Sequence, residues 1–258
     1  MLSNWRKTAK KVDPYSQLAY IYDHVMRHVN YRYWANHLVK LFKKADFPVK
    51  NVLDISCGTA SLLLDLAGLD LKVAGFDESE DMVKMARKKI RKKELNLPVW
   101  CGSMVDYKVN QEFDAVVSTY DSINYCMNID LCAAVVENTA HALRAGGLFI
   151  FDICTEKNSR KYFQNHTDRE ETEDFSYIRQ SSYSRGIQVN EFFISLNSNS
   201  KTTYHEIHKQ KIYKINEIMS IIPLEVYEMV GIYDGFSLRP GSEKSDRVYF
   251  VLRKKKLD

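Results

Sequence analysis

Two carboxylates stand where two predicted buried strands of this 258-residue chain end. Asp54 lies near the end of the apolar run 51–55, just before a short Ser/Gly/Thr turn, and Asp77 follows the run 71–76. The turn leads directly into a helical pattern, which predicts a βαβ unit. Both carboxylates would then lie at the carboxyl edge of a parallel sheet, where ligands of open α/β folds bind.

The turn differs from a pyrophosphate-binding loop, which needs the pattern G-x-G-x-x-G and no nearby anion. It contains Gly58 alone, with Ser56 and Ala60 at the flanking positions. Asp54 would repel pyrophosphate but suits a ligand that bears an ammonium and a sulfonium. Asp77, about 20 residues beyond the loop, stands where a carboxylate can accept both ribose hydroxyls. The alternative is an ordinary βαβ unit with incidental acids.

The remaining pattern supplies the elements that would position these groups. Residues 1–45 are expected to be helical, and a helix over 130–143 is expected to end at Gly146-Gly147. Alternation between 174 and 213 predicts an antiparallel insertion of three strands, and the segments 224–234 and 247–252 predict a closing hairpin. The other predicted strands are 51–55, 71–76, 98–101, 113–118 and 148–153.

These motifs together resemble the class I S-adenosylmethionine (SAM) dependent methyltransferases. The resemblance covers nearly the whole chain and is closest to a bacterial small-molecule group with an N-terminal Y-D…M…Y-x-x-W segment, here Tyr22-Asp23, Met26, Tyr31 and Trp34. It implies an α/β fold with a seven-stranded, mostly parallel Rossmann-like sheet and SAM as cofactor. It also implies a helical cover over 1–45, a core of 46–154 and 214–258, and an antiparallel β insertion over 155–213 that acts as a substrate lid.

The resemblance also implies the residues of the site. Tyr22 and Trp34 would lie near the SAM methionine moiety, where aromatic faces suit a sulfonium; the alternative is that both pack the helix pair. Ser103 stands where the family usually has an Asp that accepts from the adenine amine, so this contact would lack charge assistance. The other expected cofactor residues are Asp54, Ser56, Gly58, Asp77, Glu78, Met82, Met104 and Tyr120, and the expected substrate residues are Asp121, Asn124, Tyr125, His208 and Tyr213.

His208 is the best-placed base if the acceptor needs one. In an extended strand Glu206, His208 and Gln210 share one face, and His205 takes the other. That face could roof the substrate cavity. The alternative is a hydrogen-bonded core histidine. A neutral amine acceptor would need only eventual deprotonation, whereas a hydroxyl acceptor would need a base.

The sequence therefore predicts methyl transfer to a small-molecule N or O acceptor. The alternatives are an RNA or protein methyltransferase, or a protein that binds SAM without methyl transfer. A net charge of +4 and the absence of a basic-aromatic surface disfavour nucleic acid. No run approaches the roughly 20 apolar residues of a membrane span, and the five cysteines show no C-x-x-C spacing. We expect a cytoplasmic monomer or homodimer without a metal site.

Overall fold

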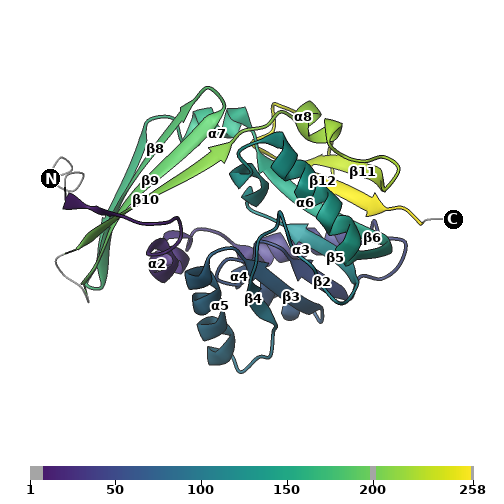
Figure 1. The fold of residues 1–258 in the computed structure, drawn as a ribbon, viewed down its shortest axis with the longest axis horizontal. Coiled ribbons are helices and arrows are strands. Elements are labelled where there is room, and N and C mark those ends of the chain that lie inside the picture. The colour runs from purple at the N-terminus through teal and green to yellow at the C-terminus, as the bar shows by residue number, and fades with distance from the viewer. Residues whose placement is uncertain (1–7, 198–201, 257–258) are drawn as a thin grey trace.

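The computed structural model describes residues 8–197 and 202–256, which form a large sheet and a smaller one (Figure 1). The large sheet has seven strands in the order β11-β12-β6-β5-β2-β3-β4. Strands β6, β5, β2, β3 and β4 are parallel to one another, and β12 is antiparallel to both β6 and β11. The expected mostly parallel sheet with a closing hairpin is confirmed. Its strands are β2 (Asn51–Asp54), β3 (Lys72–Asp77), β4 (Val99–Cys101), β5 (Phe113–Ser118), β6 (Leu143–Cys154), β11 (Tyr227–Asp234) and β12 (Arg247–Lys254).

Helices cover both faces of the large sheet, because its central strands are apolar on both sides. On one face α3, α4 and α5 bury Leu38, Leu63 and Ala86, and on the other α6 and α8 bury Val135 and Ile218. The helices are α2 (Leu18–Val25), α3 (Tyr31–Phe42), α4 (Ser61–Ala67), α5 (Glu80–Lys92), α6 (Ile129–Ala142), α7 (Glu156–Tyr162) and α8 (Ile215–Ser220), with a short 3-10 helix, η1 (Ser122–Tyr125).

Gly75 shows why β3 and α4 can pack so closely. A Cβ placed on it would meet Leu63 Cδ1 at 2.7 Å and Cys57 Cβ at 2.8 Å. Any larger residue would therefore push α4 and the loop after β2 away from the sheet. This glycine thus helps to hold the loop that carries Ser56 and Gly58.

The smaller sheet, which we call the lid sheet, has five strands in the order β1-β10-β9-β8-β7. It stands beside the carboxyl edge of the large sheet, and α2 lies between the lid sheet and α5 (Figure 1). Its strands are β1 (Lys10–Lys11), β7 (His166–Glu171), β8 (Phe175–Ser184), β9 (Ile187–Leu196) and β10 (Thr203–Lys211). The three antiparallel strands predicted between 174 and 213 are confirmed as β8, β9 and β10, and the lid sheet gains two further strands outside that range.

Two strands of the lid sheet were missed. Strand β7 is mostly exposed, so it lacks the alternation of apolar residues that marks a half-buried strand. Strand β1 pairs parallel to β10, through Lys10 opposite Tyr204 and Lys11 opposite His205, within a segment that was expected to be helical. A two-residue lysine strand held by a distant partner has no local signal. Residues 1–7 of that segment lie outside the described residues.

The expected glycine C-cap of α6 is also wrong. The helix ends at Ala142, and Gly146-Gly147 already belongs to β6. A Cβ on Gly147 would meet the backbone oxygens of Arg144 and Asp114 at 2.9 Å, beside the register shift between β5 and β6. The glycines therefore permit a bulge, in which backbones approach closely, rather than a helix end.

Within the described residues, no helix is long and apolar enough to cross a membrane. The same residues contain no group of three or more His, Cys, Asp or Glu side chains arranged to hold a metal ion.

Candidate functional site

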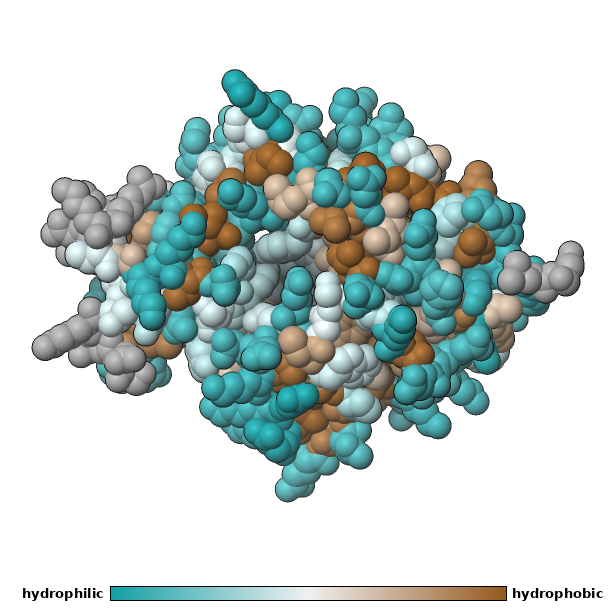
Figure 2. Space-filling view, viewed as in Figure 1, coloured by the Kyte–Doolittle hydropathy of each residue, from teal (hydrophilic) through white to brown (hydrophobic). Residues whose placement is uncertain are grey.

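A cavity of about 1150 Å³ lies between the carboxyl edge of the large sheet and the inner face of the lid sheet. The space-filling view shows the molecule hollowed between these two parts (Figure 2). One wall is formed by the loops after β2, β3 and β5. The opposite wall is formed by β8, β9 and β10, and α2 with the segment before it crosses between them.

The loop after β2 forms the acidic wall. Asp54 is 1% exposed and its Oδ1 accepts from the amide of Ser56 at 3.0 Å. Asp77 Oδ2 accepts from the amide of Gly58 at 2.9 Å, and its Oδ1 accepts from the amide of Ser79 at 3.0 Å. Gly58 has φ +53°, a left-handed conformation that favours glycine. Each carboxylate retains lone pairs for a ligand, because a carboxylate offers about four acceptor sites.

Burial changes the charge balance of this wall. It raises the pKa of Asp54 to about 7, with the neighbouring Asp77 contributing in the same direction. Burial also raises the pKa of Asp77, although hydrogen bonds from the amides of Ser79 and Gly58 partly offset the effect. A cationic ligand group beside Asp54 would reverse this shift, since an opposite charge favours the ionised carboxylate.

The loop after β5 is held in a strained conformation. Tyr120 and Asp121 have φ of 63° and 53°, which non-glycine residues rarely adopt. Asp121 forms an ion pair with the guanidinium of Arg247 and accepts from Gln210 Nε2 at 2.5 Å. Arg247 also pairs with Asp152 and lies 5.2 Å from the Tyr120 ring centroid. This buried ion cluster ties the loop to β12 on one side and to the lid sheet on the other.

A segment that we call the strap, residues 12–17, links β1 to α2 and crosses the cavity. Glu206 of β10 is fully buried and accepts from the amides of Tyr15 at 2.7 Å and Gln17 at 2.6 Å. It also accepts from the amide of Leu18, the first residue of α2, at 2.9 Å. On the other side, Ser79 Oγ donates to the Tyr15 carbonyl at 3.2 Å. The strap therefore joins the lid sheet to the loop after β3.

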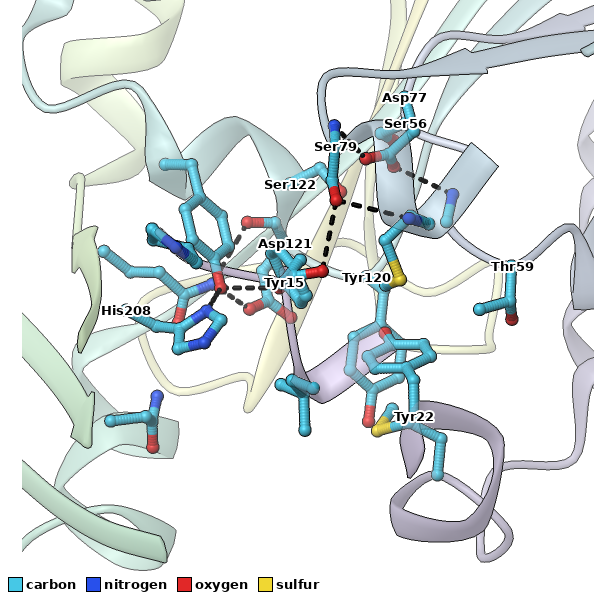
Figure 3. A pocket seen from close by; sticks show the side chains of 18 of the residues that line it. Tyr15, Tyr22, Ser56, Thr59, Asp77, Ser79, Tyr120, Asp121, Ser122 and His208 are labelled. Carbon is cyan, nitrogen blue, oxygen red and sulfur yellow. Dashed lines mark hydrogen bonds between the residues drawn. The ribbon is translucent and has the colours of Figure 1, made fainter. Parts of the chain in front are cut away.

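The hydroxyl of Tyr15 begins a chain of hydrogen bonds that runs along the cavity wall to the lid sheet (Figure 3). It lies 2.6 Å from the Tyr125 hydroxyl, which in turn lies 3.1 Å from His208 Nδ1. His208 Nε2 lies 3.0 Å from Glu206 Oε2. His208 is only 2% exposed and is packed between the rings of Tyr15 and Phe192.

The lid-sheet wall is polar but nearly charge-balanced. Gln188 Nε2 donates to Gln210 Oε1 at 2.7 Å, and Asn190 Oδ1 accepts from Ser181 at 2.6 Å. Arg179 forms an ion pair with Asp168. Amide groups therefore form much of this wall, in contrast to the acidic wall opposite.

Most of the residues that the sequence indicated do meet at this cavity. Glu206, His208 and Gln210 lie on the inner face of the lid sheet, as expected, whereas His205 stacks on Phe193 and pairs with Glu191 on the other face. The indicated residues that line the cavity are Tyr22, Asp54, Ser56, Gly58, Asp77, Glu78, Met82, Met104, Tyr120, Asp121, Tyr125 and His208.

Four indicated residues do not line the cavity. Trp34 is buried behind Tyr120, with ring centroids 5.2 Å apart, so its placement supports the packing alternative. Ser103 lies just outside, in a bridge with Asp106, and its adenine contact stays a prediction. Asn124 donates to the Lys211 carbonyl at 2.7 Å and Tyr213 donates to the Cys126 carbonyl at 2.5 Å. Both fix the joint between η1 and the lid sheet and offer no surface to a substrate.

Sequence reasoning missed several cavity residues, above all Tyr15, Arg179, Asn190 and Arg247. Arg247 begins β12, and Arg179 and Asn190 belong to the lid sheet, so all three reach the site through tertiary packing. Tyr15 had one local signal: it follows Asp13-Pro14, a pair that favours a turn. That turn separates β1 from α2.

Comparisons with known proteins agree with this geometry. Residues 52–147 match the model of a methyltransferase domain. A protein of Geobacillus sp. (strain WCH70) with a provisional methyltransferase name is 26% identical over 93% of this chain and 99% of its own length. The dTDP-3-amino-3,4,6-trideoxy-alpha-D-glucopyranose N,N-dimethyltransferase of Streptomyces venezuelae is 29% identical over 51% of this chain and 55% of its own.

The fold matches as well. The crystal structure of a SAM-dependent methyltransferase from Clostridium acetobutylicum ATCC 824 superposes with a TM-score of 0.79 at 20% identity, over 94% of this chain and 99% of that one. The domain match over residues 52–147, the relatives along the full length and the shared fold together support a class I SAM-dependent methyltransferase.

Proposed function

We propose that the protein transfers a methyl group from SAM to a nitrogen or oxygen of a small-molecule acceptor held under the lid sheet. The observation that carries the proposal is the cavity itself, which has an acidic wall and an amide-rich wall on opposite sides. A volume of about 1150 Å³ lies just above the range of roughly 300–1,000 Å³ that is typical of ligand pockets. It leaves room for a cofactor and a small acceptor together.

The residues of the acidic wall fit SAM. Asp77 can accept from the ribose hydroxyls, and the buried Asp54 suits the positive methionine end. The faces of Tyr22 and Tyr120 suit a sulfonium through cation–π attraction. When bound, SAM supplies an electrophilic methyl group that leaves its sulfonium in an in-line displacement.

The chain's own contribution to the reaction is then mainly positional. The strap and the lid sheet enclose the acceptor, exclude water and hold its nucleophilic atom in line, for which effective molarities can reach ~10⁵ M or more. The amide groups of Gln188, Asn190 and Gln210 can orient a polar, hydroxyl-bearing acceptor. The likeness to the Streptomyces enzyme, whose name gives an amino sugar nucleotide as its substrate, supports an amine on a sugar as the first acceptor to test.

The competing functions have less support. A cavity roofed by a sheet and crossed by the strap does not suit a macromolecular acceptor, which needs an open path to the methyl group. Binding of SAM without methyl transfer stays the other alternative.

The test is a turnover panel that measures S-adenosylhomocysteine formation from SAM. The acceptors are dTDP amino sugars, simple sugars with free hydroxyls, bulk tRNA and a mixture of unfolded proteins. The proposal expects product with at least one small molecule and none with the two macromolecular samples. Product from tRNA or protein alone would contradict it, and a protein that binds SAM but gives no product with any acceptor would support the binding alternative.

A further inference from the structure

The direction of each hydrogen bond in the chain from Glu206 to Tyr15 follows from counting donors. Glu206 accepts from three backbone N–H groups, those of Tyr15, Gln17 and Leu18. Burial alone would raise the pKa of Glu206, but hydrogen bonds from His208 and from the amides of Leu18 and Gln17 hold it below the usual value. The carboxyl group is therefore ionised and can only accept.

The ionised Glu206 fixes the tautomer of His208. Nε2 faces a group that only accepts, at 3.0 Å, so Nε2 must carry a proton. In neutral imidazole the other nitrogen then has no proton. Nδ1, 3.1 Å from the Tyr125 hydroxyl, must accept from it. The Tyr125 proton is thus committed to His208.

The same reasoning sets the direction at Tyr15. Since Tyr125 has one proton and donates it to His208, the 2.6 Å contact between the two hydroxyls requires Tyr15 to donate. Tyr15 lines the cavity, and toward a ligand there its hydroxyl oxygen can then only accept. When His208 is doubly protonated, Nε2 still donates to Glu206, but the bonds from Nδ1 to Tyr125 and from Tyr125 to Tyr15 reverse, and Tyr15 presents a proton to the cavity.

We propose that Tyr15 is the group that receives the acceptor's proton, and that Tyr125 passes that charge to His208, which holds it beside Glu206. The proposal rests on the proposed function, since it deepens the chemistry of the same cavity. The sequence indicated His208 as the base, whereas the proposal gives the contact with the acceptor's proton to Tyr15. His208 acts through Tyr15, because the ring centroid of Tyr15 lies 4.6 Å from that of the imidazole. Tyr125, His208 and Glu206 are thus positioning and relay residues.

The proton movements balance. The acceptor X–H bond breaks and its proton passes to the Tyr15 oxygen, while the Tyr15 proton passes to Tyr125 and the Tyr125 proton to Nδ1 of His208. The electron pair left on X forms the bond to the methyl carbon, and the pair of the carbon–sulfur bond leaves on sulfur. The products are the methylated acceptor, the thioether and a His208 imidazolium paired with the Glu206 carboxylate.

The surroundings disfavour a tyrosinate at Tyr15 or Tyr125, so the acceptor's proton comes to rest on His208 as an imidazolium. Burial raises the pKa of Tyr15 well above its usual range, and the nearby Tyr125, Asp77 and Asp121 raise it further. Burial likewise raises the pKa of Tyr125. Each tyrosine therefore stays protonated between transfers and serves as a relay. The charged and titratable groups packed around the chain of hydrogen bonds are Tyr22 of α2, Asp77 at the end of β3, Asp121 before η1 and Glu206 of β10.

The first test is the protonation of His208 in the free enzyme, measured by ¹⁵N–¹H correlation spectra of histidine-labelled protein at about pH 8, where an ordinary imidazole is neutral. The His208 signals are assigned by their loss in His208→Gln. The proposal expects the proton on Nε2 and a hydrogen-bonded Nδ1 that shifts toward its unbonded position in Tyr125→Phe. Tyr20→Phe, which removes an exposed hydroxyl of α2 outside the cavity, should leave both signals unchanged. A proton on Nδ1 of neutral His208, or an Nδ1 signal that ignores Tyr125→Phe, would overturn the proposal.

The second test is the pH profile of turnover with dTDP-3-amino-3,4,6-trideoxy-alpha-D-glucopyranose. General-base assistance is typically worth 10²–10⁴-fold, so Tyr15→Phe should lower kcat by about 10²-fold near neutral pH with the KM for SAM unchanged. The deficit should shrink as pH rises, because the acceptor amine then loses its proton to solvent. Loss that is equal at every pH would indicate a structural role for the hydroxyl and contradict the proposal.

The two proposals fail separately. If wild type shows no SAM binding by calorimetry, the proposed function fails whatever the histidine spectra show. If SAM binds but neutral His208 carries its proton on Nδ1, only the relay fails. The spectra need no acceptor, so the relay is tested even where the amino sugar gives no turnover.

Discussion

Individual residues show where the sequence was informative. Asp54, Gly58 and Asp77 were found because a strand, a turn and a carboxylate lie close together in the chain, and local spacing alone places them at one sheet edge. Tyr15 and Arg247 could not be found in this way. Each reaches the cavity only because a distant strand, β10 or β6, holds it there. The strain at Tyr120 and Asp121 likewise depends on a partner, Arg247, that lies far away in the sequence.

Asp54 predicts a pH dependence of cofactor binding. Burial raises its pKa to about 7, so in the free protein it is half protonated near neutral pH. A SAM ammonium beside it would bind the ionised form, and binding would release a proton below pH 7. Affinity should therefore rise up to about tenfold per pH unit as pH approaches 7 and level off above it. Calorimetry at pH 6, 7 and 8 in two buffers checks this, and Asp54→Asn should remove the difference. A flat profile in wild type would argue against an ammonium at this carboxylate.

Replacing Arg247 by an uncharged residue should lower the free energy of unfolding by a large amount. In Arg247→Met the carboxylates of Asp121 and Asp152 are left buried without their cation. Breaking one side of a buried ion pair typically destabilises by 3–5 kcal/mol. Urea unfolding should show a loss of about that size. The matched control is Arg239→Met, since Arg239 is 80% exposed in its pair with Asp234 and should change stability by less than about 1 kcal/mol. Equal small effects of the two substitutions would contradict the assigned role.

At the scale of elements, the sequence predicted those whose pattern is set by their own residues. The strands of the parallel sheet are apolar runs, and α5 is capped by Ser79, whose side chain accepts from the Met82 amide at 3.2 Å. The sequence prediction was wrong where pairing with a distant strand overrides local preference. Strand β1 consists of two lysines that pair with β10, and the glycines after α6 permit a bulge in β6. Strand β7, which precedes the predicted three strands, was missed because this exposed strand carries no apolar alternation.

Helix α3 carries a buried histidine that links its packing to pH. His37 is 2% exposed, packs against Tyr249 of β12 and has no hydrogen-bond partner among the described residues. Burial, with Lys40 adding to it, lowers its pKa to about 4. The unfolded chain then binds the proton more tightly, since an ordinary histidine has a pKa near 6.5. The stability it contributes is present above pH 6.5 and is lost as pH falls toward 4.

His37→Leu should therefore flatten the acid side of the stability curve. In wild type the free energy of unfolding loses up to about 1.4 kcal/mol per pH unit between pH 6.5 and 4 through this group. Urea unfolding at pH 7 and pH 5 gives the slope in each variant, and His141→Leu, on the exposed end of α6, is the control. The same slope in His37→Leu as in wild type would show that His37 is not the responsible group.

At the scale of the whole molecule, two sheets share one cavity, and the strap holds them together through Glu206 on one side and Ser79 on the other. The large sheet supplies the wall that fits SAM, and the lid sheet supplies the amide groups. The acceptor's identity could not be predicted from the sequence, because it depends on the shape formed by residues of β8, β9 and β10 together.

The most direct test of this account is SAM affinity in Asp77→Ala, measured by calorimetry beside wild type. Loss of a charge-assisted hydrogen bond costs about 1.5–3 kcal/mol, so SAM should bind roughly 10- to 150-fold more weakly. Asp130→Ala, at the exposed start of α6, removes a carboxylate away from the cavity and should keep wild-type affinity. Melting curves of both variants show whether the loop between Gly58 and Ser79 stays folded. Unchanged SAM affinity in a folded Asp77→Ala, or no SAM binding in wild type, would contradict the account.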